Sequence, residues 1–527
     1  MNVLTEKNKN TINNMAFFTV LFICFLGVFR FQKGIGGGVA FSSIKTTLIS
    51  LLIIGALIIL PIVIFYKREW KIEKIFLVIA IVLGGIFMCI LPPLQAPDEE
   101  VHMIRAYDLA NGRIFFKGNE NSLVLPSSMR EYREKVGLNR IAFNADQKII
   151  ENDYEDAKKI QLDKERVEKY NPTKTEAYLS LAYLPQATGM FIGDLLNLPF
   201  HYVFYLGRIT NFLVWLGLSY MALKIIPIKK ELLMFVMLLP MSVQQAVSVV
   251  PDALLNSCSF LLVAYILYLR FVKEKVDKKD VIVICSLCIG IVAVKLPYML
   301  ISALIFIVPK DKFGNGAILK KIGVFILVLV LGFSTFISWN IVSKESTPLN
   351  KQQIIEETES SSAGYVYTAK QILENPVKFA HVVKNTIKEK GEFYIQTFVA
   401  RFGWIETIAP QKLVWVGIII IVLLALFGAD SFKLNWWDRV VFLCIGTGMF
   451  IVLCVITFMW DGADFNNTTV CNGIQGRYFI PFCMPFLLTF YQQKVKIDLK
   501  KLQWLVPLLS VFMITFSLSV IYVRYWI

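Results

Sequence analysis

The sequence predicts an all-α polytopic membrane protein, a single helical bundle over residues 1–527 with about 12–14 transmembrane spans. Three observations predict this class. Hydrophobic residues make up 56% of the chain and charged residues only 18%, against roughly 45–50% and 25% in soluble domains. The hydrophobic residues form long uncharged runs such as 48–66 and 75–94, and about 20 such residues cross a bilayer as a helix. Basic residues cluster in the short connections between these runs.

The net charge of +15 comes largely from these basic clusters. Such clusters mark the cytoplasmic loops of membrane proteins. They therefore indicate topology and not a nucleic-acid partner, and membrane lipids are expected around the bundle. Most of the nine cysteines lie inside apolar runs, where cysteine usually acts as a small hydrophobic residue. The C-x-x-C pair Cys285 and Cys288 has no histidine nearby, so we expect no metal or redox site there.

Positive charge predicts the topology from the N-terminus onward. Lysines precede the first apolar run and place the N-terminus in the cytoplasm. We expect that run to be a retained helix, because no small-residue cleavage site of a signal peptide follows it. Helices at about 14–31, 46–66 and 75–94 then carry the chain to the outer face just before Asp98.

The first extracytoplasmic segment spans residues 95–177, which is too long for the charge rule to apply within it. Residues 178–197 fit a span, a re-entrant piece or an interfacial helix, and the sequence leaves these alternatives open. Two further outer segments are expected at 344–411 and 460–478. The remaining apolar runs predict helices at 202–223, 231–249, 253–272, 281–294, 298–308, 322–343, 412–428, 440–459, 479–492 and 503–522.

The stretch QAPDEEVHMIRAYDLANG leaves the membrane and at once presents charged residues. As a helix over 98–110 that begins after Pro97, it places Asp98 and His102 near one face. One interpretation is a capped interfacial helix whose acids only complement the helix dipole. The other is catalytic, with Asp98, or Glu99 in its place, accepting a proton from an acceptor hydroxyl.

A metal site is a further interpretation of the same stretch. Asp98 and His102 would supply two of its ligands. The chain has only three histidines, so carboxylates would have to complete the site, which suits Mg²⁺ or Mn²⁺ better than Zn²⁺. The sequence identifies no complete ligand set and no other cofactor.

A second informative stretch is GIQGRYFIP, which contains Gln475, Arg477 and Tyr478. Arginine donates bidentate hydrogen bonds to phosphate, and glycines let backbone N–H groups approach an anion. These three residues are therefore candidates for binding a lipid phosphate. The alternative is an ordinary aromatic belt with an arginine that reaches the interface. Lys295, in VKLPY, is either a second phosphate donor or a plain interface anchor.

Other polar residues on the predicted outer side are candidates for substrate binding or support. Asp252 follows QQAVSVVP, and polar groups within a span are costly unless they face a cavity. Trp404 and Glu406 lie in GWIET, where an aromatic face can stack on a sugar. The remaining candidates of this kind are Glu100, His102, Arg105 and Asp461.

Three motifs in order, PPLQAPDEEVHMIRAYDLANG, ARFGWIETIAP and GIQGRYFIP, carry a resemblance to a known family. Over about residues 75–490 the chain resembles a bacterial polytopic membrane family known only as a domain of unknown function. That family is similar to the GT-C class of membrane glycosyltransferases. The resemblance implies a GT-C-like bundle with Asp98 as base, Glu99 as the next candidate, and Arg477 as the residue that binds lipid phosphate. The chain has D-E-E where GT-C families often have two acids, so which acid is the base stays open.

The resemblance implies an inverting glycosyltransferase in a bacterial plasma membrane, acting at the extracytoplasmic face. It would move a sugar from a polyprenyl-phosphate donor to a cell-surface glycan or a lipid-linked acceptor. A transporter or flippase of a lipid-linked sugar, and a polymerase or ligase of surface polysaccharide, are the alternatives. Transporters usually carry internal repeats and mid-membrane polar sites. No repeat is visible in this sequence, and the polar candidates gather on one predicted face.

Overall fold

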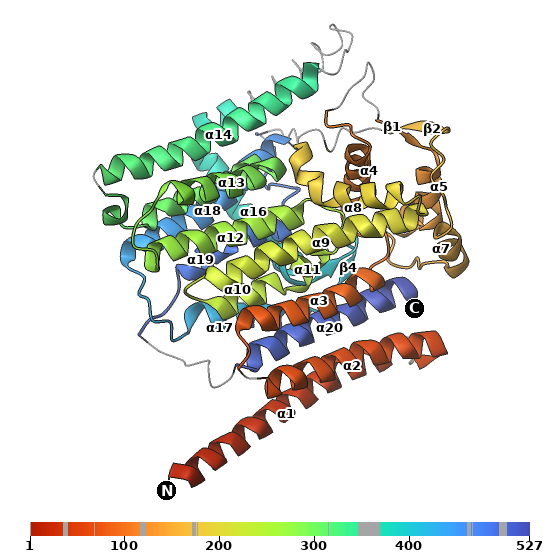
Figure 1. The fold of residues 1–527 in the computed structure, drawn as a ribbon, viewed down its shortest axis with the longest axis horizontal. Helices are drawn as coiled ribbons and strands as arrows, with labels where there is room; N and C mark the ends of the chain where they lie inside the picture. The colour runs from red at the N-terminus through yellow and green to blue at the C-terminus, as the bar shows by residue number, and fades with distance from the viewer. Residues whose placement is uncertain are drawn as a thin grey trace.

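Helices dominate the fold, which confirms the all-α class (Figure 1). The computed structural model describes residues 2–34, 41–67, 69–115, 123–170, 175, 178–314, 316–345, 369–460, 465, 467–494 and 503–527. Strands are short and few in these ranges. The antiparallel pair β1 (Leu123–Pro126) and β2 (Val167–Tyr170) forms one two-stranded sheet, and β3 (Arg401–Phe402) with β4 (Thr407–Ile408) forms another.

Eight helices among the described residues are long and apolar enough to cross a membrane. Each corresponds to one of the apolar runs predicted to span. They are α1 (Asn2–Gly34), α2 (Ile44–Tyr66), α3 (Ile72–Ile90), α9 (Phe200–Ile225), α12 (Asp252–Phe271), α14 (Ala317–Glu345), α18 (Trp436–Trp460) and α20 (Leu505–Trp526).

The other apolar runs predicted to span the membrane form shorter or broken elements. The expected number of 12–14 transmembrane spans is therefore a number of apolar runs, and not all of these runs form continuous helices. The run 231–249 divides into α10 (Lys230–Met237) and α11 (Pro240–Ala246). Pro240 starts the second piece because it has no N–H to continue the first. Two other runs behave similarly: 298–308 becomes the 3₁₀ helix η4 (Leu296–Ile307), and 479–492 gives η6 (Gly476–Phe482) and α19 (Cys483–Leu488).

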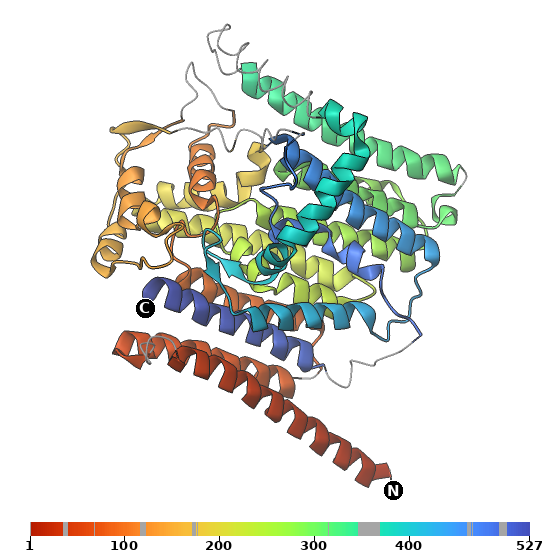
Figure 2. The same cartoon turned by 180° about the vertical axis from the view of Figure 1, so that it is seen from behind.

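Three more elements complete the bundle. They are α13 (Lys278–Val294), α16 (Pro376–Val399) and α17 (Gln411–Leu426), with a short 3₁₀ turn, η5 (Lys310–Phe313), before α14. In Figure 2 the cyan helix α16 crosses the face of the bundle obliquely, and η6 packs against it. α20 packs on α2 and α3 at one edge of the bundle, while α14 packs on α13 and η4 at the other.

The undecided segment 178–197 folds as η3 (Ser180–Tyr183) followed by α8 (Leu184–Leu195). At 1.5 Å per residue, the 12 residues of α8 are about 18 Å long, too short to cross a bilayer. α8 packs closely on α9 through a G-x-x-x-G face. A Cβ on Gly189 would lie 2.1 Å from the Leu206 carbonyl oxygen, so only glycine permits this approach.

The first predicted outer segment forms small helices beyond the end of α9, coloured orange in Figure 1. Its helices are α4 (Glu99–Ala110), α5 (Ser128–Lys135), α6 (Leu138–Ile141) and α7 (Glu151–Ala157).

Candidate active site

Asp98 lies where the chain turns from α3 into α4. The predicted helix start is one residue early, because α4 begins at Glu99 and Asp98 is its N-cap in the left-handed region, with φ 61°. Its side chain makes no capping hydrogen bond, which argues against the interpretation as a simple helix cap. Its carboxylate is 42% exposed. The preceding turn is held by Trp404, whose Nε1 donates to the Leu94 carbonyl at 3.0 Å.

Glu99 points the other way, into the bundle, and is fully buried. Arg208 of α9 donates from Nε and Nη2 to its two carboxylate oxygens at 2.9 and 2.8 Å. The Val249 N–H donates to the same carboxylate at 2.9 Å. Arg208 also binds the Leu91 and Pro92 carbonyls at 2.8 and 3.0 Å. Glu99 therefore ties α4 to α9 and to the turn before Asp98, and its oxygens are occupied.

The next charged residues of the motif also bind within the fold. Glu100 pairs with Arg133 of α5. Arg105 is fully buried and pairs with Asp108 at 2.8 Å. Its Nη2 also donates to the Ile114 carbonyl at 2.7 Å, which fastens the chain after α4. Both residues hold α4 to the elements packed around it.

His102 lies one turn after Asp98 and is buried. Its Nδ1 is 2.8 Å from the Tyr183 hydroxyl, and the Tyr178 ring meets it edge-on at 5.2 Å. Burial lowers the pKa of His102 to about 4, although the nearby carboxylates of Asp252 and Asp98 favour its protonated form. The imidazole is therefore neutral at physiological pH.

Two cations from distant parts of the chain meet beside Asp98. An Nη of Arg477 in η6 is 3.7 Å from the Asp98 carboxylate, and the Arg477 side chain is only 5% exposed. Lys295, between α13 and η4, pairs with Asp252 at 3.1 Å. The Tyr478 ring contacts both cations: its centroid is 4.4 Å from Lys295 Nζ and 5.4 Å from the Arg477 guanidinium.

Gly476 places Arg477 at this position. A Cβ there would lie 1.8 Å from the Tyr394 carbonyl oxygen and 2.6 Å from the Phe398 nitrogen, so only glycine lets η6 pack against α16. The Gly476 N–H donates to Thr397 Oγ1 at 2.7 Å. This glycine therefore serves packing, because its N–H is bound within the protein and does not face an anion.

The comparisons with known proteins bear on most of the chain. The family described as predicted membrane protein (DUF2142) matches residues 81–486, more than half of the sequence. The chain belongs to the DUF2142 family. No curated protein and no solved structure matches it. DUF2142 membership confirms the resemblance to a membrane family of unknown function, while the GT-C likeness stays a prediction.

The other predicted site residues of this DUF2142 chain have different surroundings. Glu406 is bound by groups near the chain end, with Tyr525 Oη at 3.2 Å and Arg524 Nη2 at 3.3 Å. Its GWIET neighbour Trp404 supports the turn before Asp98, as described above. Gln475 precedes η6, and its Oε1 is buried without a hydrogen-bond partner in the described part of the chain. Asp461 lies outside the described residues.

No metal cluster forms among the described residues, where no group of three or more His, Cys, Asp or Glu side chains lies close enough to hold an ion. Within the described part of the chain, the structure brings Asp98, His102, Asp252, Lys295 and Arg477 together.

Sequence reasoning missed three residues of the site. Arg208 lies in an apolar span, and an arginine at such depth signals a buried partner. Tyr178 and Tyr183 carry no such signal, because tyrosines near a membrane surface are common. Their contact with His102 depends on how η3 packs on α4.

Proposed function

We propose that this DUF2142 protein is a membrane glycosyltransferase that moves a sugar from a polyprenyl-phosphate donor to an acceptor hydroxyl. One observation carries the proposal. A part-exposed carboxylate, Asp98, lies 3.7 Å from the buried cation of Arg477, with Lys295 bound to the same tyrosine ring. A base and two phosphate-binding cations are the groups that this reaction needs.

Asp98 is the acid of the D-E-E stretch that we assign as base. Glu99 is fully buried against Arg208 and Glu100 pairs with Arg133, whereas the Asp98 carboxylate is 42% exposed. In an inverting transfer the acceptor hydroxyl gives its proton to Asp98. The oxygen of the acceptor hydroxyl forms a bond to the anomeric carbon of the sugar. At the same time, the bond between that carbon and the phosphate oxygen breaks.

Arg477 and Lys295 are assigned to the departing phosphate. The leaving oxygen keeps the bonding electron pair, and donors in a water-poor site stabilise that charge strongly. In the absence of substrate the same cations are balanced by Asp98 and Asp252. Arg477 Nε is buried without a hydrogen-bond partner in the described residues, so it can donate to an incoming anion. The transfer needs no nucleotide.

We assign the site to the extracytoplasmic face of a bacterial plasma membrane, with the N-terminus in the cytoplasm. The distribution of basic residues supports this orientation, because short lysine-rich connections follow the ends of helices far from Asp98. The partners proposed are the lipid-linked sugar donor, a cell-surface glycan or lipid-linked acceptor, and membrane lipids.

The test uses a deletion strain that carries wild-type protein, Asp98→Asn, or Asp146→Asn. Asp146 is an exposed acid of the same outer segment and serves as the control. Membrane levels of each variant are compared first, and the surface glycan is then analysed by mass and linkage. We expect Asp98→Asn to lack one sugar substituent, as the deletion does, and Asp146→Asn to retain it.

Other outcomes separate the alternatives. Loss of glycan chain length, with every substituent kept, would favour a polymerase or ligase. A normal glycan in the Asp98→Asn strain, alongside an altered one in the deletion strain, would contradict the role of Asp98. The base would then have to be Glu99 or Glu100, or transport would be favoured.

A further inference from the structure

A second group of basic residues lies at the far end of the helix that carries Asp252. From Asp252 to Arg270, α12 runs 18 residues, which is about 27 Å at 1.5 Å per residue. η4 runs in the same direction as α12, from Lys295 at its N-cap to Phe306 near its end. This distance is close to the roughly 30 Å thickness of a bilayer core. The two groups therefore lie near opposite membrane surfaces.

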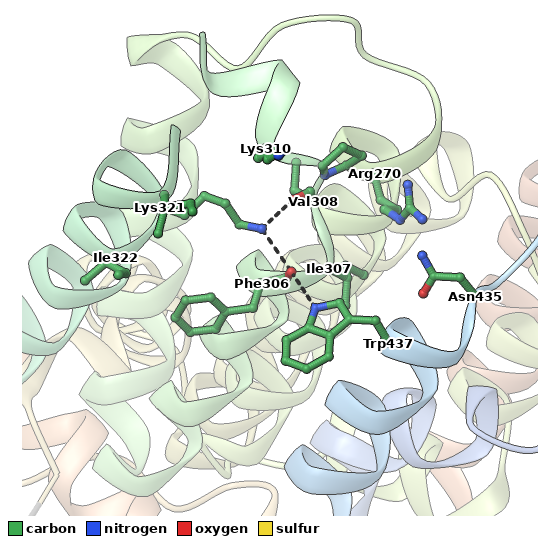
Figure 3. Close-up of a pocket in the computed structure, with 11 residues that line it drawn as sticks. Arg270, Phe306, Ile307, Val308, Lys310, Lys321, Ile322, Asn435 and Trp437 are labelled. Atoms are coloured by element: carbon green, nitrogen blue, oxygen red, sulfur yellow. Dashed lines mark hydrogen bonds between the residues drawn. The ribbon is translucent and has the colours of Figure 1, made fainter. Parts of the chain in front are cut away.

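The far group surrounds a pocket of about 480 Å³ between α12, η4, α14 and α18 (Figure 3). Three of its lining residues are basic, Arg270, Lys310 and Lys321, and none of the lining residues is acidic. Apolar side chains and the Trp437 indole complete the wall. The pocket combines positive charge with an apolar side, as an amphiphilic anion requires.

The charges of the pocket are only partly balanced. Arg270 pairs with Asp438 at 3.2 Å. Lys321 Nζ donates to two backbone carbonyls, Phe306 at 3.0 Å and Val308 at 2.6 Å, and makes no ion pair in the described part of the chain. Lys310 is exposed and likewise has no ion pair among the residues described. An anion between the two lysines would supply the missing negative charge.

The apolar side points to a lipid and not to a water-soluble anion. Ile318, Ile322 and Ile326 follow one another at four-residue spacing along α14 and are 64%, 39% and 51% exposed. Residues at this spacing form one stripe of a helix. Trp436 and Trp437, 72% and 44% exposed, mark the depth of the membrane interface.

We propose that this pocket binds the headgroup of an anionic phospholipid. The lipid phosphate lies between Lys310 and Lys321, and one acyl chain runs along the isoleucine stripe of α14. The Trp437 indole, whose Nε1 donates to the Phe306 carbonyl at 3.2 Å, holds η4 beside the headgroup. The site is independent of the Asp98 cluster and of the reaction proposed for it.

Native mass spectrometry of the purified full-length protein tests the proposal. Phosphatidylglycerol and phosphatidylcholine with identical acyl chains are the probes. The variants are Lys310→Ala and Lys310→Ala/Lys321→Gln, and the control is Lys278→Ala, an exposed lysine at the same end of the bundle but outside the pocket. We expect wild type and control to prefer phosphatidylglycerol, and the preference to fall about fivefold for each pocket lysine removed.

Three results would overturn the proposal. The first is equal retention of both lipids by the wild type. The second is loss of the preference in Lys278→Ala to the same extent as in Lys310→Ala. The third is displacement of phosphatidylglycerol by millimolar inorganic phosphate, which would identify a site for a soluble anion. Lys310→Ala removes an exposed side chain, so it keeps the test valid if the double variant does not fold.

Discussion

Replacing Glu99 by glutamine would separate the structural acid from the proposed base. Glu99 and Arg208 are both fully buried and make two contacts of 2.9 and 2.8 Å. The substitution leaves the Arg208 charge in the bundle without its partner. Breaking a buried ion pair in this way costs about 3–5 kcal/mol. Because Arg208 also binds the Leu91 and Pro92 carbonyls, we expect a loss near the lower limit, about 3 kcal/mol.

The assay measures the thermal unfolding midpoint of the purified protein. The protein is heated in one detergent, and the fraction that stays folded is measured by gel filtration. Glu100→Gln is the matched control, since Glu100 is 18% exposed and pairs with Arg133, which is 21% exposed. We expect Glu99→Gln to lower the midpoint by several degrees and Glu100→Gln to change it little. A Glu99→Gln protein as stable as wild type, but unable to restore the glycan, would refute the reasoning and make Glu99 the base.

Three further predictions follow from the same geometry. Asp98→Asn should keep the free energy of unfolding within about 0.5 kcal/mol of wild type, because asparagine tolerates the left-handed backbone of this residue and the 3.7 Å ion pair is part-exposed. A large loss of stability would contradict a purely chemical role. Burial lowers the pKa of His102 to about 4, so between about pH 6.5 and 4 the unfolded chain binds a proton that the folded protein does not, and stability falls as the pH drops through that window. His102→Gln should therefore flatten the pH dependence of the unfolding midpoint. An unchanged slope would contradict this prediction. Gly476→Ala should cost about 1–3 kcal/mol and displace Arg477, because its Cβ would meet the backbone of α16, while Gly448→Ala, with nothing within 4 Å, should be neutral in the same melting and glycan assays.

Much of the fold could be predicted from hydropathy alone. The eight long helices match apolar runs because a run of this length has one stable form in a bilayer. The broken elements could not be placed so well. Pro240 starts a new helix inside an apolar run, and the segment after residue 178 gives only the short helix α8. Hydropathy indicates that a segment is buried, but it does not say whether lipid or protein buries it. A short helix packed on α9 can therefore be as apolar as a helix that spans the membrane.

The sequence could predict which residues belong to the candidate site, but it could not predict which partners they contact. The motifs supplied Asp98 and Arg477, and the distribution of positive charge placed Asp252 and Lys295 on the same face. The structure brings the four residues together. Trp404 and Glu406 were expected near a sugar. In the structure Trp404 supports the turn before Asp98, and Glu406 pairs with Arg524. These contacts join segments far apart in the sequence, and no local pattern encodes them.

The sequence by itself determined the membrane class, the positions of the long helices and the two motifs that carry the site. Only the tertiary structure decided which acid of the D-E-E stretch faces outward. Asp98 precedes the helix with a left-handed backbone, whereas Glu99 is the first helical residue, so the two side chains leave the chain in different directions. Glu99 is turned inward because Arg208, 109 residues later, offers a buried partner. That partner depends on how α4 packs against α9, and it leaves Asp98 beside Arg477 with its carboxylate accessible.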